Sequence, residues 1–219
     1  MRTLSLPELY SNLRKHFGHQ GWWPAQTRDE IIIGAILTQQ TSWKNVEKAI
    51  SNLREARLLG LESIRKAKLH SIELCIRPSG FYKQKAAHLK DFAEYLHSRY
   101  DGIDSMFSKD SGELRQELLS IKGIGKETAD SIMLYVAGKH MFIIDAYTRR
   151  ITSRIYGSDP KIPYDELRFD ISASIPEDLD MYKDFHAQFV ELGKRYCKTK
   201  PLCNDCPVKS YCQYNSKNG

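Results

Sequence analysis

Residues 118–129 read Leu118-Leu119-Ser120-Ile121-Lys122-Gly123-Ile124-Gly125-Lys126-Glu127-Thr128-Ala129, and this stretch decides the fold. It places a G-x-G turn between the end of one amphipathic helix and the start of another. Glycines permit close backbone approach, and the N–H groups at the start of the second helix can bind an anion such as a phosphate. A dinucleotide-binding loop is excluded, because the third glycine of G-x-G-x-x-G is missing and no strand precedes the turn. A plain hairpin between two helices is the simpler alternative.

Helical periodicity continues on both sides of this turn. Apolar residues recur three and four positions apart, and alternating runs of β-branched residues are almost absent. The pattern predicts helices over residues 4–17, 29–37, 46–53, 61–67, 71–75, 83–100, 111–119, 126–137, 146–156, 164–174 and 181–196. Connections are short and no internal repeat is present, so the predicted fold class is all-α.

Composition excludes several other classes of protein. The 219 residues are 41% hydrophobic and 27% charged, which fits neither a disordered nor a fibrous chain. The longest apolar stretches, such as residues 31–37, are too short to span a membrane. Residues 1–20 mix charged and apolar side chains and do not resemble a secretory signal, so we expect a cytoplasmic protein without membrane association. A formal net charge of +6 favours polyanionic partners without identifying one.

Four of the five cysteines crowd into the C-terminal tail, as Cys197-x5-Cys203-x2-Cys206-x5-Cys212. In a chain without an export signal, such clustering favours metal ligation over disulfides. Zinc ribbons usually pair two C-x2-C knuckles and this tail has one, which favours an iron–sulfur cluster over zinc. The interleaved Lys198, Lys200 and Lys209 could face the phosphates of a polyanionic partner or only solubilise the tail. Cys75 is expected to be a buried core thiol.

A second candidate site follows the turn by twenty residues, in Ile143-Ile144-Asp145-Ala146-Tyr147. An aspartate that precedes a helix is most often an N-cap. Here the residue follows the apolar run 141–144, and burial there could also tune its carboxylate for catalysis.

The two stretches together resemble the helix-hairpin-helix DNA glycosylase superfamily, and the tail resembles the cysteine loop of its endonuclease III branch. The resemblance extends from residues 34–41 through Phe185-His186 to the cysteines. It implies two helical domains: a six-helix barrel with the hairpin over residues 24–138, and a second domain of residues 1–23 and 139–219 that ends in the cysteine loop, residues 197–212. It also implies that damaged double-stranded DNA is bound with one base flipped out.

The resemblance assigns roles to individual residues. Asp145 is the expected catalytic carboxylate, Gln40 enters the gap in the base stack, and Phe81 is the wedge opposite, unless Phe81 only packs in the core. The hairpin residues expected to contact DNA are Lys122, Gly123, Gly125, Lys126 and Thr128. The four tail cysteines would bind a 4Fe-4S cluster, although the first gap is one residue shorter than is usual in the family.

Position 127 bears on strand cleavage. Bifunctional members of the superfamily carry a lysine two positions after the second hairpin glycine, which forms a Schiff base with the sugar. This chain has Glu127, and a carboxylate cannot form that imine. We therefore expect a monofunctional enzyme without AP-lyase activity, with Lys122 and Lys126 as neighbours that could substitute weakly.

The tryptophans narrow the expected substrate. Trp22, Trp23 and Pro24, together with Trp43, would line the base pocket, although adjacent tryptophans also serve as core anchors. Stacked aromatic faces favour positively charged bases such as 3-methyladenine and 7-methylguanine. Residues 22–24, 37–41 and 77–82 resemble the 3-methyladenine DNA glycosylase branch.

The expected function is therefore hydrolysis of the N-glycosidic bond of alkylated purines in base excision repair, by a monomer. One alternative is a mismatch uracil or thymine glycosylase, which would read the pyrimidine edge by hydrogen bonds. Another is a non-catalytic DNA-binding protein with an iron–sulfur cluster, which the presence of Asp145 disfavours.

Overall fold

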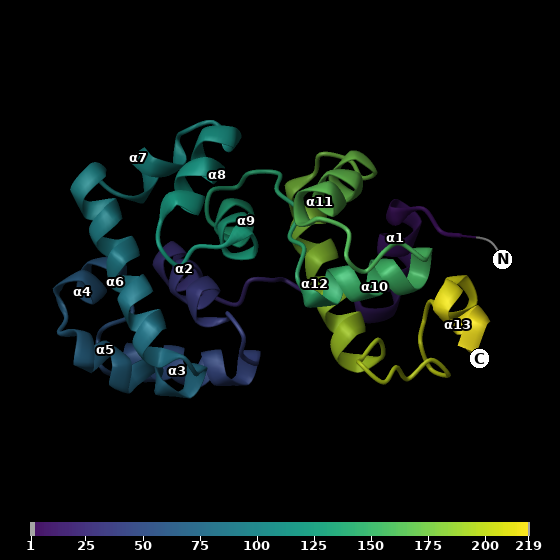
Figure 1. The fold of residues 1–219 in the computed structure, drawn as a ribbon, viewed down its shortest axis with the longest axis horizontal. Coiled ribbons are helices and arrows are strands. Elements are labelled where there is room, and N and C mark those ends of the chain that lie inside the picture. Colours follow the sequence, from purple (N-terminus) through teal and green to yellow (C-terminus); the bar gives the residue numbers. More distant parts are fainter. Residues whose placement is uncertain (1–2, 219) are drawn as a thin grey trace. The chain divides into compact units, whose positions relative to one another are not determined.

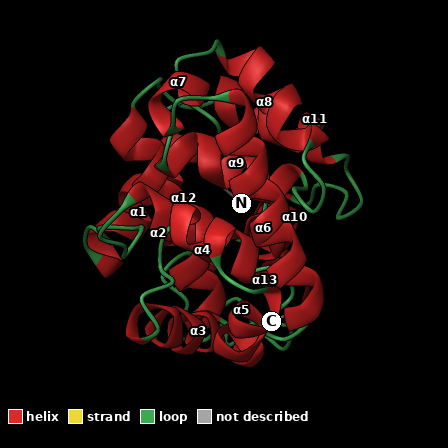
Figure 2. Cartoon of the chain, turned by 90° about the vertical axis from the view of Figure 1, so that its left-hand side faces the viewer, coloured by secondary structure: helices red, strands yellow, loops and turns green. Residues whose placement is uncertain are grey.

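The structure, a computed structural model, describes residues 3–218. All regular elements among these residues are helices, which confirms the predicted all-α class (Figure 2). The chain divides into two compact units, Pro24–Lys139 and Met1–Trp23 with His140–Gly219. We call them the hairpin unit and the terminal unit.

The hairpin unit contains eight α-helices in the described part of the chain (Figure 1). They are α2 (Arg28–Leu37), α3 (Trp43–Glu55), α4 (Leu61–Lys66), α5 (Leu69–Ile76), α6 (Tyr82–Arg99), α7 (Ile103–Phe107), α8 (Ser111–Ser120) and α9 (Lys126–Tyr135). A 3-10 turn, η1 (Arg77–Ser79), leads into α6. The central helix is α2, which is buried from Ile32 to Leu37 and packs against α3, α6 and α9. The end of α2 and the start of α9 are therefore fixed by apolar packing.

The terminal unit is built around α12 (Leu179–Arg195), which packs against α1 (Leu6–Phe17) and α10 (Ala146–Tyr156). Helices α11 (Tyr164–Ala173) and α13 (Gln213–Asn218) and the 3-10 turn η2 (Lys209–Tyr211) complete it. Its core is aromatic: the rings of Phe185 and Phe189 stack with centroids 4.7 Å apart, and Phe142 meets both edge-on.

Side-chain caps define where several helices begin. A side-chain oxygen accepts a hydrogen bond from the backbone three residues on, which satisfies one of the N–H groups left unpaired at a helix start. The residues that cap in this way are Ser5, Thr27, Asp110, Asp145 and Asp178. Asp145 is therefore a structural cap, as its position before an apolar-periodic stretch suggested.

Some expectations required adjustment. The short helices α7 and α13 were not predicted, because a five- or six-residue helix shows too little of the helical period. Cys75, expected to be buried, is half-buried, and burial raises the pKa of its thiol. No helix in residues 3–218 is both long enough and apolar enough to cross a membrane.

Candidate active site and nucleic-acid interface

The two glycines of the hairpin occupy different environments. Gly123 has a φ of +86°, and a Cβ placed on it would lie 2.2 Å from the ring of His88 on α6. Gly125 is extended, and a Cβ placed on it would meet nothing within 4 Å. Only glycine therefore fits at Gly123, whereas Gly125 lies where another molecule can approach the start of α9.

Gln39 joins the end of α2 to the hairpin. Its Nε2 donates to the carbonyl oxygen of Gly123 at 2.9 Å and to the hydroxyl of Thr128 at 2.9 Å. Thr128 is only 5% exposed, so its hydroxyl serves this internal bond and does not lie at the surface. Lys122 and Lys126 are exposed. Of the hairpin residues predicted to contact DNA, Thr128 is therefore buried and supports the turn, whereas Lys122 and Lys126 lie at the surface.

Gln40 and Phe81 are exposed residues of the hairpin unit with left-handed backbone. Their φ angles are 52° and 45°, and Phe81 is 62% exposed. A left-handed conformation costs a residue with a side chain about 1–2 kcal/mol. Phe81 is therefore not packed in the core, and both residues are held at the surface in a conformation that costs energy.

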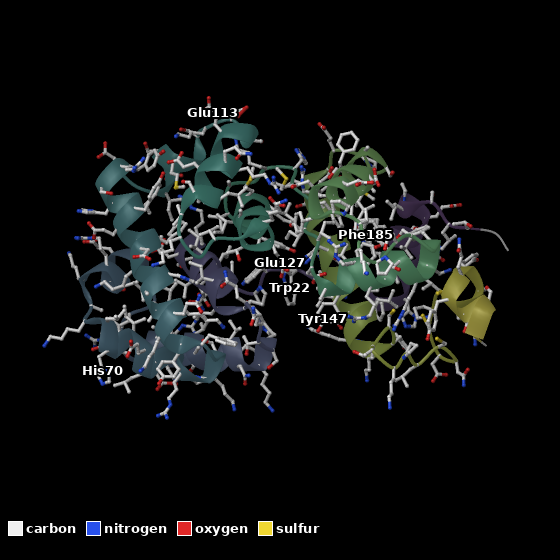
Figure 3. All side chains as sticks on the ribbon, in the orientation of Figure 1. Trp22, His70, Glu113, Glu127, Tyr147 and Phe185 are labelled. Atoms are coloured by element: carbon white, nitrogen blue, oxygen red, sulfur yellow. The ribbon has the colours of Figure 1, made fainter. Side chains whose placement is uncertain are left out.

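Asp145 lies at the start of α10 with both carboxylate oxygens engaged. Oδ1 accepts a hydrogen bond from the backbone N–H of Thr148 at 2.7 Å, and Oδ2 lies 3.6 Å from Nε2 of His186. The side chains of Asp145 and His186 are 13% and 7% exposed. His186 comes from α12. The preceding residue in the chain, Phe185, belongs to the core and is labelled in Figure 3.

The electrostatics of this pair keep Asp145 ionised. Burial alone would raise the pKa of Asp145, but the polar contact and charge of His186 and the Thr148 amide outweigh it. The pKa of the carboxyl therefore lies below its usual value. A shielded carboxylate that is fixed in place can stabilise positive charge that develops on a neighbouring group.

Trp22 and Trp23 lie half-buried in the terminal unit, with ring centroids 6.0 Å apart. The ammonium of Lys194, near the end of α12, lies 5.2 Å from the Trp22 ring centroid.

Trp43 belongs to the hairpin unit, where it begins α3 and its indole N–H donates to Glu47 at 3.0 Å. Pro24 is exposed and begins the hairpin unit. Glu127 is exposed in the first turn of α9 (Figure 3).

The four tail cysteines line one small pocket in the terminal unit, together with apolar residues such as Leu192 and Val208. Arg154, on α10, approaches Cys197 Sγ at 3.3 Å and accepts a contact from Cys212 at its carbonyl oxygen. Burial is the main cause that raises the pKa of Cys206 to about 11; a backbone hydrogen bond at Val208 opposes this shift, and the three other thiols add to it. Within residues 3–218, no three His, Cys, Asp or Glu side chains converge on a point that could hold a single metal ion.

Sequence reasoning missed three residues that support these sites. Gln39 and His186 appeared only as members of stretches that resemble the family, and His88 was not considered. Each contacts a residue far along the chain. Gln39 donates a hydrogen bond to the Gly123 carbonyl, the ring of His88 packs against Gly123, and His186 lies beside the Asp145 carboxylate. Periodicity and spacing report on local structure, so they carried no signal for these pairs.

A helical fold with a G-x-G hairpin, and an aspartate at a helix start, define a protein of the helix-hairpin-helix class. The family model described as "HhH-GPD superfamily base excision DNA repair protein" matches residues 33–177. The chain belongs to this superfamily.

Three relatives are informative. A Methanocaldococcus jannaschii protein named as a candidate DNA repair glycosylase is 45% identical over 207 residues, which cover 94% of each chain. Endonuclease III of Thermotoga maritima is 30% identical, covering 86% of this chain and 84% of its own. The structure of H. pylori 3-methyladenine DNA glycosylase bound to 1,N6-ethenoadenine matches with a TM-score of 0.79 and 28% identity, covering 88% of this chain and 98% of that one. The chain is thus a DNA glycosylase of the superfamily.

Proposed function

We propose that the protein is a monofunctional glycosylase that excises alkylated purines, such as 3-methyladenine and 7-methylguanine, from double-stranded DNA. One observation carries the proposal: the carboxylate of Asp145 is kept ionised in a shielded position by His186 and the Thr148 amide. Cleavage of an N-glycosidic bond builds positive charge on the sugar, and a fixed carboxylate stabilises that charge.

Binding begins at the hairpin, where the N–H groups at the start of α9 and the exposed Lys122 and Lys126 meet DNA phosphates. Gln40 enters the gap left by the flipped base, and Phe81 separates the neighbouring bases. Flipping a base out costs a few kcal/mol, which these contacts offset.

In the chemical step, the bond between the base and C1′ of the sugar breaks and water forms a new bond to C1′. A cationic alkylated base leaves as a neutral molecule, taking the electron pair of the broken bond. Asp145 orients the water and accepts its proton, which then passes to solvent. The products are the free base and an abasic site on an intact strand.

Strand cleavage by a covalent route requires an amine that attacks C1′. Position 127, at the start of α9, carries a carboxylate, which cannot form an imine. We therefore propose that the enzyme has no AP-lyase step of its own.

Substrate class is proposed from the tryptophans. Aromatic faces attract a cationic base by cation–π interaction, which contributes about 0.5–2 kcal/mol. Lys194 already lies over Trp22, so we propose that the base stacks on Trp23 or Trp43.

For the tail, we propose a 4Fe-4S cluster bound by Cys197, Cys203, Cys206 and Cys212, with zinc as the alternative. The donor set fits, because all four thiols are unbridged and line one pocket with apolar walls and nearby Arg154 and Lys209. Thiolates are the ligands of such clusters, and the cations offset their negative charge. We also propose that the two units act as the two domains of a monomer.

Base release from defined duplexes tests the function. Duplexes that carry 7-methylguanine, 3-methyladenine, U:G or T:G are incubated with excess enzyme, and the released bases are identified by mass spectrometry. We expect release of the methylated purines alone. Release only of uracil or thymine would support a mismatch glycosylase, and binding without release of any base would support a non-catalytic role.

A further inference from the structure

Lys85, on α6, is a lysine buried inside the hairpin unit. The residue is 2% exposed, and its ammonium donates two hydrogen bonds to backbone carbonyls. One acceptor is Leu37 O at 2.9 Å, at the end of α2, and the other is Ser79 O at 2.7 Å, at the end of η1. A single side chain therefore joins the ends of two elements that lie far apart in the sequence.

The charge of Lys85 is balanced by carbonyl oxygens and not by a carboxylate. Among residues 3–218, no Asp or Glu side chain forms an ion pair with Lys85. Burial lowers the pKa of this lysine to about 8. Burying a charge without a counter-ion costs free energy, although the negative end of the α2 dipole offsets part of it.

The two clamped carbonyls lie just before the two residues proposed to enter DNA. Gln40 follows Leu37 by three positions, and Phe81 follows Ser79 by two. Gln40, Phe81 and Arg57 are the non-glycine residues with positive φ in the described part of the chain. The backbone N–H of Lys85 also donates to Phe81 O at 3.0 Å. Two of the three non-glycine residues with positive φ thus lie within three positions of a carbonyl that Lys85 binds.

We propose that Lys85 is the positioning residue that holds Gln40 and Phe81 together in the conformation needed to unstack a base in duplex DNA. The inference rests on the proposed function, because it assumes that these two residues enter the stack. A positive φ persists in a residue with a side chain only when its surroundings enforce it. Two hydrogen bonds from one buried ammonium provide that enforcement on both segments at once.

Lys90 provides a matched control on the same helix. Its ammonium donates to a single backbone carbonyl, that of Ala67, at 2.6 Å, at the end of α4. Lys90 is half-buried and is bonded to neither of the two segments. Lys85→Met and Lys90→Met each remove one ammonium from α6, but only the first removes the clamp.

The test measures base release under single-turnover conditions from two duplexes. In one, 7-methylguanine lies opposite cytosine; in the other, it lies opposite an abasic analogue, so less pairing must be broken. We expect Lys85→Met to slow release from the paired duplex about 10–100-fold, the cost of misplacing a positioned group. We expect the loss on the second duplex, and the loss for Lys90→Met on both, to stay within about threefold.

Hydrogen exchange on the full-length protein without DNA gives a readout that does not depend on activity. Amides of residues 38–42 and 79–82 should exchange faster in Lys85→Met and at the wild-type rate in Lys90→Met. If the wild-type protein releases no base, the proposed function fails, and the exchange result still decides whether Lys85 is a clamp. If Lys85→Met does not fold, Lys85→Gln, which keeps one amide donor, is measured with the same expectations.

Two results would overturn the proposal. One is exchange in residues 38–42 and 79–82 that is the same in both variants and in wild type. The other is an equal loss of activity on the paired duplex and on the duplex with the abasic analogue, since that would show a defect in the chemical step and not in unstacking.

Discussion

In the proposed mechanism Asp145 has two roles, as a helix cap and as the catalytic carboxylate, and the same geometry supports both. One oxygen caps α10 through the Thr148 amide, and the other faces His186, so the side chain is fixed by the fold before any DNA arrives. Preorganised charge is effective in catalysis because no reorganisation is needed when the transition state forms. In the proposed mechanism the cap therefore contributes to the chemistry by holding the carboxylate in place.

Exchanging Asp145 for asparagine separates these roles. Asparagine caps a helix about as well as aspartate, so we expect Asp145→Asn to fold with a melting temperature near that of the wild type. It lacks the negative charge, and we expect single-turnover release of 7-methylguanine to fall by about 10²–10⁴-fold. Asp178→Asn, which changes the cap of α12, is the matched control and should keep full activity. Unchanged activity in Asp145→Asn would place the catalytic carboxylate elsewhere.

The pH dependence of the reaction tests the contact between His186 and Asp145. The pKa of Asp145 lies below its usual value, so the active carboxylate form is present above that pKa and is lost as the pH falls through it. His186→Gln removes the charge that lowers this pKa, so the acid limb of the rate profile should move to higher pH. His140→Gln, at an exposed histidine of the same unit, should leave the profile unchanged. An acid limb that does not move in His186→Gln contradicts this electrostatic role.

At the scale of elements, the two glycines of the hairpin are needed for different reasons, one for folding and the other for access to the start of α9. Gly123 is confined by the ring of His88 and by its positive φ, whereas the missing side chain of Gly125 leaves the start of α9 open. One glycine is therefore required by folding, and the other is suited to contact with an anion.

Alanine at each position should reveal this difference. Gly123→Ala should lower the free energy of unfolding by about 1–3 kcal/mol, because it adds both backbone strain and a clash with His88. Gly125→Ala should change it by less than about 0.5 kcal/mol, but should weaken binding to duplex DNA. Urea denaturation and a binding titration measure the two effects. A Gly123→Ala variant as stable as Gly125→Ala would show that the packing against His88 is not needed.

Helices could be predicted from the sequence because each long helix shows its own apolar period. The predicted helix at 146–156 matches α10, and the one at 111–119 differs from α8 by one residue. The predicted helix over 46–53 began too late, because its first turn, from Trp43, is half-exposed and lacks the apolar period. Short helices such as α7 span barely one turn and gave no such signal.

The site was predictable where the signal is local and not where it depends on tertiary contact. Asp145 lies at an apolar-to-helix junction that the sequence shows directly. Lys85 looks like any lysine on an amphipathic helix, and only the packed structure shows that it is buried and bonded to Leu37 and Ser79. His186 pairs with a residue 41 positions away, which no spacing rule addresses.

At the scale of the whole molecule, α10 connects the proposed catalytic residue with the cysteine loop inside the terminal unit. Asp145 caps the start of the helix, and Arg150 and Arg154 lie along it. Arg150 donates to Cys197 O at 2.8 Å, and Arg154 donates to Lys198 O at 2.6 Å and Thr199 O at 3.0 Å. Disorder in the cysteine loop should therefore loosen the helix that carries Asp145.

Loss of one proposed ligand tests this connection. We expect Cys206→Ser to reduce bound iron and to lower the free energy of unfolding by more than about 3 kcal/mol, as is usual when a structural metal site is lost. Base release should fall with it. Cys75→Ser, at a half-buried thiol of the hairpin unit, is the control and should keep the iron content and the activity. Iron binding and stability that are unchanged in Cys206→Ser would contradict the proposed ligand set.

The central claim is that water breaks the N-glycosidic bond without a covalent bond between protein and DNA. The most direct measurement incubates the enzyme with a labelled 7-methylguanine duplex, with and without borohydride, and scores strand breaks before and after alkali. We predict free base, breaks only after alkali, and no protein–DNA adduct trapped by borohydride. Breaks before alkali together with a trapped adduct would contradict the claim, because they require an amine of the protein to attack the sugar.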